Sequence, residues 1–415
     1  MPRIQIPAVI LAGGAAASLY GWALFLSTFS HPGSIGLNLN APGSDWLVFY
    51  GAVRSFFAGR LDLIFDGEGF TAYLNTAFSA WLSKPMPYRP WVYPPTYLLF
   101  LLPFGKLTFA GSYFAFQLAS GALLALALAW KADRPRCRPF VIGATLLCPA
   151  AAINVAVGQN AFLTAALLVG GLRVLRWHRV FGGVVLAMLA LKPQFGLLVP
   201  MALIAGKEWR ALISSVVAGA TFLGTSVAVF GIDAWWQWLD LSATSYADAN
   251  GKWMEYGRMW GDSVYACVSA SGAPAATANA AQVAALCVSA ALVFRAFRSP
   301  LPGDQKIAVL LAATILAAPH SSLHDAVMLA IAAALWVSGL AQSGQSIWKW
   351  PLALALWLAP LFNPPLISIV GRFTPIGIII FIVAALVRGN RAGLASPMSH
   401  EARALKSGVG SAPSL

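Results

Sequence analysis

Long apolar blocks recur from one end of the 415-residue chain to the other, and they constrain its fold more than any other feature. Examples lie at 6–29, 211–230, 307–318 and 376–387. A bilayer-spanning helix needs about 20 mostly apolar residues. Only 10% of the residues are charged, which is too few to cover a soluble domain of this length. Because a lipid-exposed backbone must satisfy its own hydrogen bonds, the blocks predict an all-α, polytopic transmembrane helical bundle.

The order of the blocks predicts about eleven or twelve spans. The first block is longer than the apolar core of a signal peptide, so we expect a retained helix. Two amphipathic stretches at 45–58 and 69–82 predict helices in the first outer loop that lie in the membrane interface or pack on the protein. The apolar region 93–130 is broken at 103–105, so we expect a short or re-entrant piece before its crossing. Further spans are expected at 140–157, 161–176, 180–191, 194–206, 211–230, 278–296, 306–319, 326–341, 350–369 and 374–388.

Charge fixes the expected orientation. With the N-terminus inside, the inner loops of this layout hold 18 of the 27 Lys and Arg residues and the outer loops hold eight, as the positive-inside rule requires. The net charge of +13 is therefore a topology signal, and we expect no nucleic acid as a partner. Residues 1–390 are predicted to form one domain in a bacterial-type plasma (inner) membrane, with a disordered cytoplasmic tail at 391–415.

Polar residues at membrane depth are costly and usually functional. The first of four such places on the predicted outer side is Asp45, directly after the first span. Its carboxylate is suited to take a proton from an acceptor hydroxyl if it is buried beside the reacting groups. Alternatively, Asp45 caps the helix that follows. Tyr50 and Arg54 on that helix are candidates for substrate binding.

Two more places are turns between apolar segments. The segment 93–97 carries two prolines between tyrosines, which predicts a rigid corner at a helix entrance, with rings also suited to stack on a sugar. The turns 158–160 and 192–194 separate short spans, and interrupted helices often mark binding sites. Lys192 either binds a phosphate as a point charge or snorkels to anchor a helix end. The substrate-binding candidates here are Tyr93, Gln159, Asn160 and Gln194.

The fourth place is the turn 319–325, which holds His320, His324 and Asp325. Paired titratable groups between two apolar runs indicate a site, although an ordinary polar turn is the alternative. Two His and one Asp so close in sequence are weak evidence for a metal. The four cysteines form no CxxC pair, so we expect no metal site and no disulfide framework. Walker, GxGxxG, HExxH and GxSxG motifs are absent, which disfavours ATP-driven transport and serine hydrolase chemistry.

Taken in order, these motifs resemble a known family. The residues that carry the resemblance are Asp45, Phe49, Tyr50, Ala52, Gly59, Arg60, Leu61, Tyr93, Pro94, Pro95, Gly158, Gln159, Asn160, Leu191, Lys192, Pro193, Pro319, His320, His324 and Asp325. The set is similar to glycosyltransferase family 87, whose members have the GT-C membrane fold. The resemblance implies inverting transfer of a hexose, mannose-like, from a polyprenyl-phosphate donor outside the cytoplasm. It also implies that Asp45 is the catalytic residue; relatives often carry an aromatic residue where this chain has His324.

A mechanism follows as a hypothesis. Asp45 deprotonates the acceptor hydroxyl, whose oxygen attacks the anomeric carbon opposite the lipid phosphate, while Lys192 and His320 bind that phosphate. Phosphate is a good leaving group, so no cofactor is expected and a divalent metal is not obligatory. The expected partners are the polyprenyl-phosphate sugar donor, a lipid or glycan acceptor and the bilayer. The main alternative is a lipid-linked saccharide transporter or flippase without catalysis; a ligase that moves a whole glycan is a third.

Overall fold

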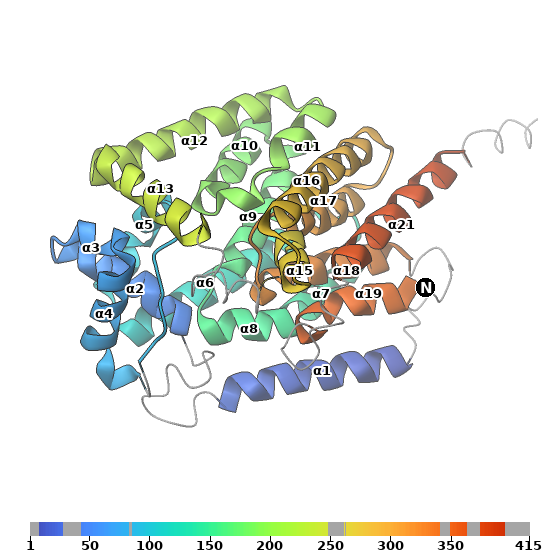
Figure 1. The fold of residues 1–415 in the computed structure, drawn as a ribbon. Coiled ribbons are helices and arrows are strands. Elements are labelled where there is room, and N and C mark those ends of the chain that lie inside the picture. The colour runs from blue at the N-terminus through green and yellow to red at the C-terminus, as the bar shows by residue number, and fades with distance from the viewer. Residues whose placement is uncertain are drawn as a thin grey trace, which may run out of the picture.

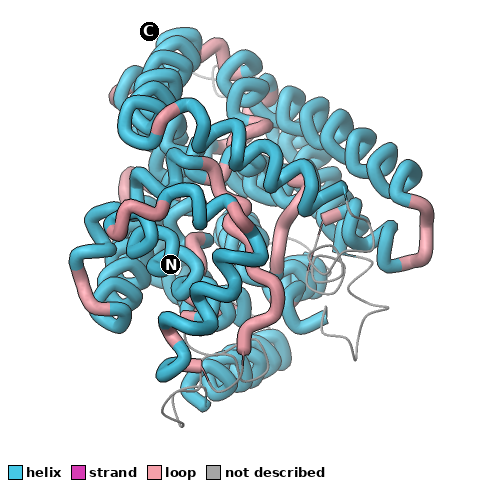
Figure 2. The backbone as a smooth tube through the Cα atoms, turned by 60° about the vertical axis from the view of Figure 1, so that its left-hand side comes forward, coloured by secondary structure: helices cyan, strands magenta, loops and turns pink. Residues whose placement is uncertain are grey.

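The computed structural model describes residues 8–27, 43–82, 85–247, 261, 263–340, 349–362 and 374–394. Within these ranges the chain forms helices and no β-strand (Figure 2), which confirms the all-α class. The predicted tail lies outside the described residues from 395 onward, whereas residues 391–394 belong to the last helix. The α-helices are α1 Ala8–Ser27, α2 Ser44–Phe57, α3 Leu61–Phe65, α4 Gly67–Ala77, α5 Pro95–Leu101, α6 Phe109–Ala129, α7 Arg138–Leu146, α8 Pro149–Val157, α9 Ala161–Leu175, α10 Arg179–Ala187, α11 Val199–Ala205, α12 Trp209–Phe230, α13 Ile232–Ala247, α15 Val264–Ala270, α16 Ala275–Arg298, α17 Gly303–Ala317, α18 Val327–Leu340, α19 Lys349–Trp357 and α21 Thr374–Leu394.

Short 3-10 helices interrupt or extend these elements. They are η2 Ser79–Trp81, η3 Leu102–Lys106, η4 Pro135–Cys137, η5 Met188–Leu191, η6 Pro193–Phe195, η7 Leu323–Ala326 and η8 Ala359–Phe362. The break expected at 103–105 is real, because α5 has seven residues and passes into η3 before α6 begins. At 1.5 Å per residue α5 is about 10 Å long and cannot cross a bilayer, so α6 supplies the crossing in this region.

Three helices, α6, α12 and α16, are long and apolar enough to cross a membrane by length and composition. The segment made of η4 and α7 forms a pair with α8. Together the two are also long and apolar enough to cross a membrane, although the pair is bent by 53°. Five shorter apolar helices have 10–17 residues. Several expected spans are therefore shorter or broken, because Pro149 and the Lys192–Pro193 step interrupt helical hydrogen bonding. The polytopic helical architecture itself is confirmed.

The centre of the bundle is formed by α9, α17 and α18, whose described side chains are nearly all buried. The helix α9 packs on α6, α10, α17 and α18. Figure 1 shows α2, α3, α4 and α13 gathered at one side of the bundle and α18, α19 and α21 at the other. Of the two alternatives for the stretch at 45–58, packing on protein is the one found for α2, which buries Trp46, Phe49 and Val53.

Candidate functional site

The helix α2 carries Asp45 in its first turn. The cap residue is Gly43, and the helix has no side-chain capping bond, so the capping interpretation of Asp45 was wrong. Trp46 fixes the start of the helix, because its Nε1 donates to Ser112 Oγ at 2.9 Å and its ring stacks on Phe116. The Asp45 side chain faces the turn that follows α8. The positive end of the α2 helix dipole favours its negative charge.

The turn after α8 meets the start of α2. Gly158 ends α8 with φ 77°, a left-handed conformation that favours glycine. A Cβ built on Gly158 would lie 2.6 Å from Trp46 Cβ, so the close approach also requires glycine. The Gly43 N–H donates to Ala156 O at 2.7 Å. This packing brings Gln159 to Asp45, and Gln159 Nε2 donates to Asp45 Oδ2 at 2.9 Å.

Buried polar groups fix the orientation of Gln159. Its Oε1 accepts from the Tyr93 hydroxyl at 3.1 Å and from the Asn160 N–H at 3.2 Å, which leaves its NH₂ group to donate to the carboxylate. Its backbone oxygen accepts from Gln117 Nε2 at 2.9 Å, and Gln117 Oε1 accepts from Asn154 Nδ2 at 3.0 Å. The sequence analysis did not identify Gln117 or Asn154 as site residues. The signal that could have found them is an amide side chain within an otherwise apolar helix.

An extended segment at 85–94 adds Arg89 and Tyr93. Asn75 on α4 holds this segment through two hydrogen bonds to the Met86 backbone, at 2.7 and 3.1 Å. Arg89 is buried, and its Nη1 lies 3.8 Å from Asp45 Oδ1. Burial is the main cause that raises the pKa of Tyr93 well above its usual value, so its hydroxyl keeps the proton donated to Gln159. Sequence reasoning had treated Arg89 only as an outer-loop charge, and no motif marked it. Pro95 begins α5, as the predicted rigid corner requires.

Lys192 lies between η5 and η6 and is buried, which excludes the snorkelling alternative. Its Nζ lies 2.7 Å from Asp325 Oδ1 and 3.3 Å from Asn160 Oδ1. Asp325 Oδ2 accepts from the Ser322 N–H at 3.0 Å as part of a capping box, and His324 Nε2 lies 3.5 Å from the same oxygen. Since Asn160 follows Gln159, one continuous polar cluster joins Asp45 to Asp325.

Residues 91–319 of the chain match the family model of glycosyltransferase family 87. The chain belongs to glycosyltransferase family 87. No curated protein and no solved structure matches it. The family implies that the chain is a glycosyltransferase, and its apolar helices and family membership suggest a membrane protein. The matched residues include Tyr93, Gln159 and Lys192, whereas Asp45 and Asp325 lie outside the match and reach the cluster through the fold.

The cluster contacts described above do not involve four other candidates of this family 87 chain. On α2, Tyr50 and Arg54 point to other faces than Asp45, because five and nine residues correspond to rotations of about 140° and 180°. The Tyr50 hydroxyl donates to Leu107 O at 3.0 Å, and Arg54 is exposed. Within the described residues, no hydrogen bond or ion pair joins the half-buried Gln194 to the cluster. His320 is half-buried, its ring centroid is 6.4 Å from that of Tyr265, and burial lowers its pKa to about 4.

The opposite end of the transferase carries a second buried ion pair. Arg173 Nη2 lies 2.6 Å from Asp304 Oδ1. The Asp133 N–H donates to Asp304 Oδ2 at 3.1 Å, and the Asp304 N–H donates to Asp133 Oδ2 at 2.7 Å. The helix α9 begins directly after Asn160 and contains Arg173 near its end, so about 20 Å of helix separates the two ends. Among the described residues, no group of three or more His, Cys, Asp or Glu side chains is arranged to hold a metal ion.

Proposed function

We propose that this family 87 chain transfers a hexose, mannose-like, from a polyprenyl-phosphate donor to a lipid or glycan acceptor, with inversion at the anomeric carbon. The observation that supports the proposal is the continuous cluster from Asp45 through Gln159 and Asn160 to Lys192. It provides a carboxylate to accept a proton and an ammonium to receive a phosphate, which are the two groups that the reaction needs. Lys192 is held by buried hydrogen bonds, and Asp45 is held by a partly buried one.

Asp45 is the proposed general base. Its side chain is 15% exposed, so an acceptor hydroxyl can reach it, and Arg89 and Gln159 face its two oxygens. The acceptor oxygen forms the new bond to the anomeric carbon as its proton passes to Asp45, and the bond from that carbon to the phosphate oxygen breaks. A fixed carboxylate serves this step well, because misplacement by about 1 Å can cost 100-fold in rate.

Lys192 is the proposed phosphate ligand. Its ammonium is already shared between Asp325 and Asn160, so a phosphate oxygen can replace the weaker contact at 3.3 Å without leaving Asp325 unpaired. The negative charge on the phosphate grows as the bond breaks, and a pre-positioned cation stabilises that charge in the transition state. His320 is neutral at pH 7, because burial lowers its pKa to about 4, so it would contribute an imidazole hydrogen bond and no positive charge. Tyr93 and His324 remain candidates for the sugar.

We further propose that the reaction needs no cofactor or divalent metal, because polyprenyl phosphate is a good leaving group and the Lys192 ammonium can donate a hydrogen bond to it. The proposed setting is the plasma (inner) membrane of a bacterial-type cell, with the cluster on the periplasmic side. The distribution of Lys and Arg supports this orientation: Arg173, Arg176 and Arg179 lie at the opposite end of α9 from the cluster, which the positive-inside rule places in the cytoplasm.

The test supplies purified protein in micelles with a panel of polyprenyl-phosphate sugars and measures released polyprenyl phosphate. Asp45→Asn should lower turnover by about 100- to 10,000-fold, the usual contribution of a general base. Asp62→Asn is the matched control, since Asp62 is also in the first turn of an outer-loop helix but is exposed. Equal turnover in the two variants would remove Asp45 from the mechanism. Donor translocation across vesicles without product would favour the flippase instead.

A further inference from the structure

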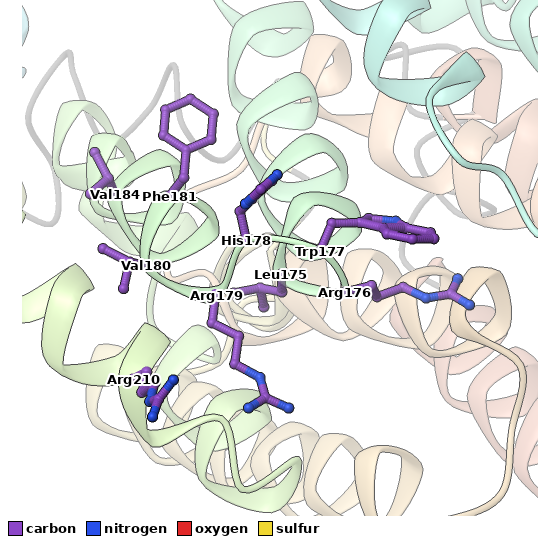
Figure 3. Close-up of a pocket in the computed structure, with 9 residues that line it drawn as sticks. All are labelled: Leu175, Arg176, Trp177, His178, Arg179, Val180, Phe181, Val184 and Arg210. Atoms are coloured by element: carbon purple, nitrogen blue, oxygen red, sulfur yellow. The ribbon is translucent and has the colours of Figure 1, made fainter.

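A basic groove lies at the turn between α9 and α10, at the far end of α9 from the cluster. It has a volume of about 860 Å³. Figure 3 shows the residues that line it. Its lining comes from the end of α9, the turn after it, the start of α10 and the start of α12. The lining residues are Leu175, Arg176, Trp177, His178, Arg179, Val180, Phe181, Val184 and Arg210.

The groove has excess positive charge. Arg176 pairs with Asp133, and Arg179 Nε lies 3.1 Å from Glu208 Oε2. Arg210 forms no ion pair within the described part of the chain. In Figure 3 the side chains of Arg179 and Arg210 extend to the same side of the turn. Both are exposed, and the Arg179 side chain is 59% exposed, so they remain available to an anion from outside.

Large apolar side chains surround these arginines. Trp177, Phe181 and Trp209 are 58%, 59% and 54% exposed. Along α12 the apolar surface continues through Val216 and Val217, which are 64% and 60% exposed. Exposed Trp beside Arg, next to an apolar helix face, is the pattern of a membrane interface, where rings lie at the headgroup level. A continuous exposed apolar surface of this kind is unfavourable in contact with water alone.

We propose that this groove binds the headgroup of an anionic phospholipid, with the phosphate between Arg179 and Arg210 and the acyl chains along α10 and α12. Basic pockets at the cytoplasmic end of membrane helices recognise anionic headgroups in this way. The proposal rests on the orientation given under the proposed function, since that orientation puts the groove in the cytoplasmic leaflet. The groove and the sugar-transfer cluster lie at opposite ends of α9, so lipid binding here is separate from donor binding.

The test uses the delipidated full chain in a neutral detergent and measures the dissociation constant for short-chain phosphatidylglycerol by native mass spectrometry. Each arginine removed should weaken binding about fivefold, so Arg179→Gln with Arg210→Gln should weaken it about 25-fold. Arg210→Gln alone is included because it breaks no ion pair of the described chain. Arg298→Gln is the matched control, since Arg298 is an exposed arginine in the last turn of α16 and does not line the groove.

The proposal is supported if phosphatidylglycerol binds more weakly to both groove variants and equally well to Arg298→Gln. It also requires that the unmodified chain binds phosphatidylcholine and free glycerol phosphate much more weakly than phosphatidylglycerol. Equal losses in groove and control variants would show general charge attraction and overturn it. Glycerol phosphate that binds as tightly as the lipid would show a free-phosphate site and also overturn it. Because the readout is binding, failure of sugar transfer leaves this result unaffected.

Discussion

The buried pair of Lys192 and Asp325 makes a prediction that separates stability from activity. Their side chains are 5% and 2% exposed and the charged atoms are 2.7 Å apart. At an effective dielectric constant of about 20, the attraction at 2.7 Å is about 6 kcal/mol, which mainly offsets the cost of removing both charges from water. Lys192→Met removes the attraction but leaves the carboxylate buried. It should therefore lower the free energy of unfolding by about 3–5 kcal/mol.

The double variant, Lys192→Met with Asp325→Asn, should recover much of that loss. The asparagine oxygen can still accept the Ser322 N–H that closes the capping box, while the uncompensated charge is gone. We expect a coupling free energy of about 2–3 kcal/mol between the two sites, measured as the midpoint and slope of denaturant unfolding in mixed micelles. Turnover should stay low in both variants, because neither has an ammonium for the phosphate.

Asp304→Asn is the control for destabilisation. It breaks the equally buried pair with Arg173 at the other end of α9, so it should cost similar stability and keep the turnover of each folded molecule. If the Lys192 and Asp325 double variant regains both stability and full turnover, Lys192 is a structural residue and the phosphate site is elsewhere. If the double variant recovers no stability, the two charges are not energetically coupled, contrary to what their geometry indicates.

Three further perturbations test the site. Gly158→Ala must accommodate a Cβ 2.6 Å from Trp46 Cβ at a φ of 77°, and should cost about 2–5 kcal/mol, whereas Gly143→Ala, in open space, should not destabilise; thermal unfolding checks both. Arg89→Gln should lower kcat by about 100-fold with little change in KM, and Arg89→Lys should restore part of it, if Arg89 positions the proposed base 3.8 Å away. Burial lowers the pKa of His320 to about 4, so the unfolded state binds more protons between pH 6.5 and 4 and stability falls as the pH drops through that window. His320→Gln should remove up to about 3 kcal/mol of this pH dependence, measured as the stability difference from wild type at pH 7 and pH 4.5.

Much of the fold followed from the apolar pattern, because span position depends on local composition. The break at 103–105 and the helix start at Pro95 were predictable, since proline acts on its own backbone. Span length was less predictable. The chain bends at Pro149 between α7 and α8, although the two helices together are long and apolar enough for one span. Helical register separates Tyr50, a predicted substrate-binding residue, from Asp45, because sequence proximity on α2 does not mean a shared face.

The polar partners were harder to predict, because they are distant in sequence. Asp45 and Gln159 are 114 residues apart, and Lys192 and Asp325 are 133 residues apart. Each residue lies at a turn that interrupts apolar sequence, which identified it as a candidate, but only packing shows which turns meet. Arg89 gave no signal at all, since it lies in an extended segment whose position depends on hydrogen bonds to α4.

The two buried ion pairs differ in a way that bears on function. Arg173 Nη1 also donates to the carbonyls of Ala127 and Trp130 at the end of α6, so both Nη groups of its guanidinium have partners. Lys192 has one strong contact and one long contact to an amide, and Asn160 connects it to the partly exposed Asp45. The ammonium of Lys192 can exchange its long contact for a phosphate oxygen, whereas the Nη groups of Arg173 are held by a carboxylate and by helix-end carbonyls. The same bundle thus holds one charge pair fitted to lock helices together and another fitted to take part in chemistry.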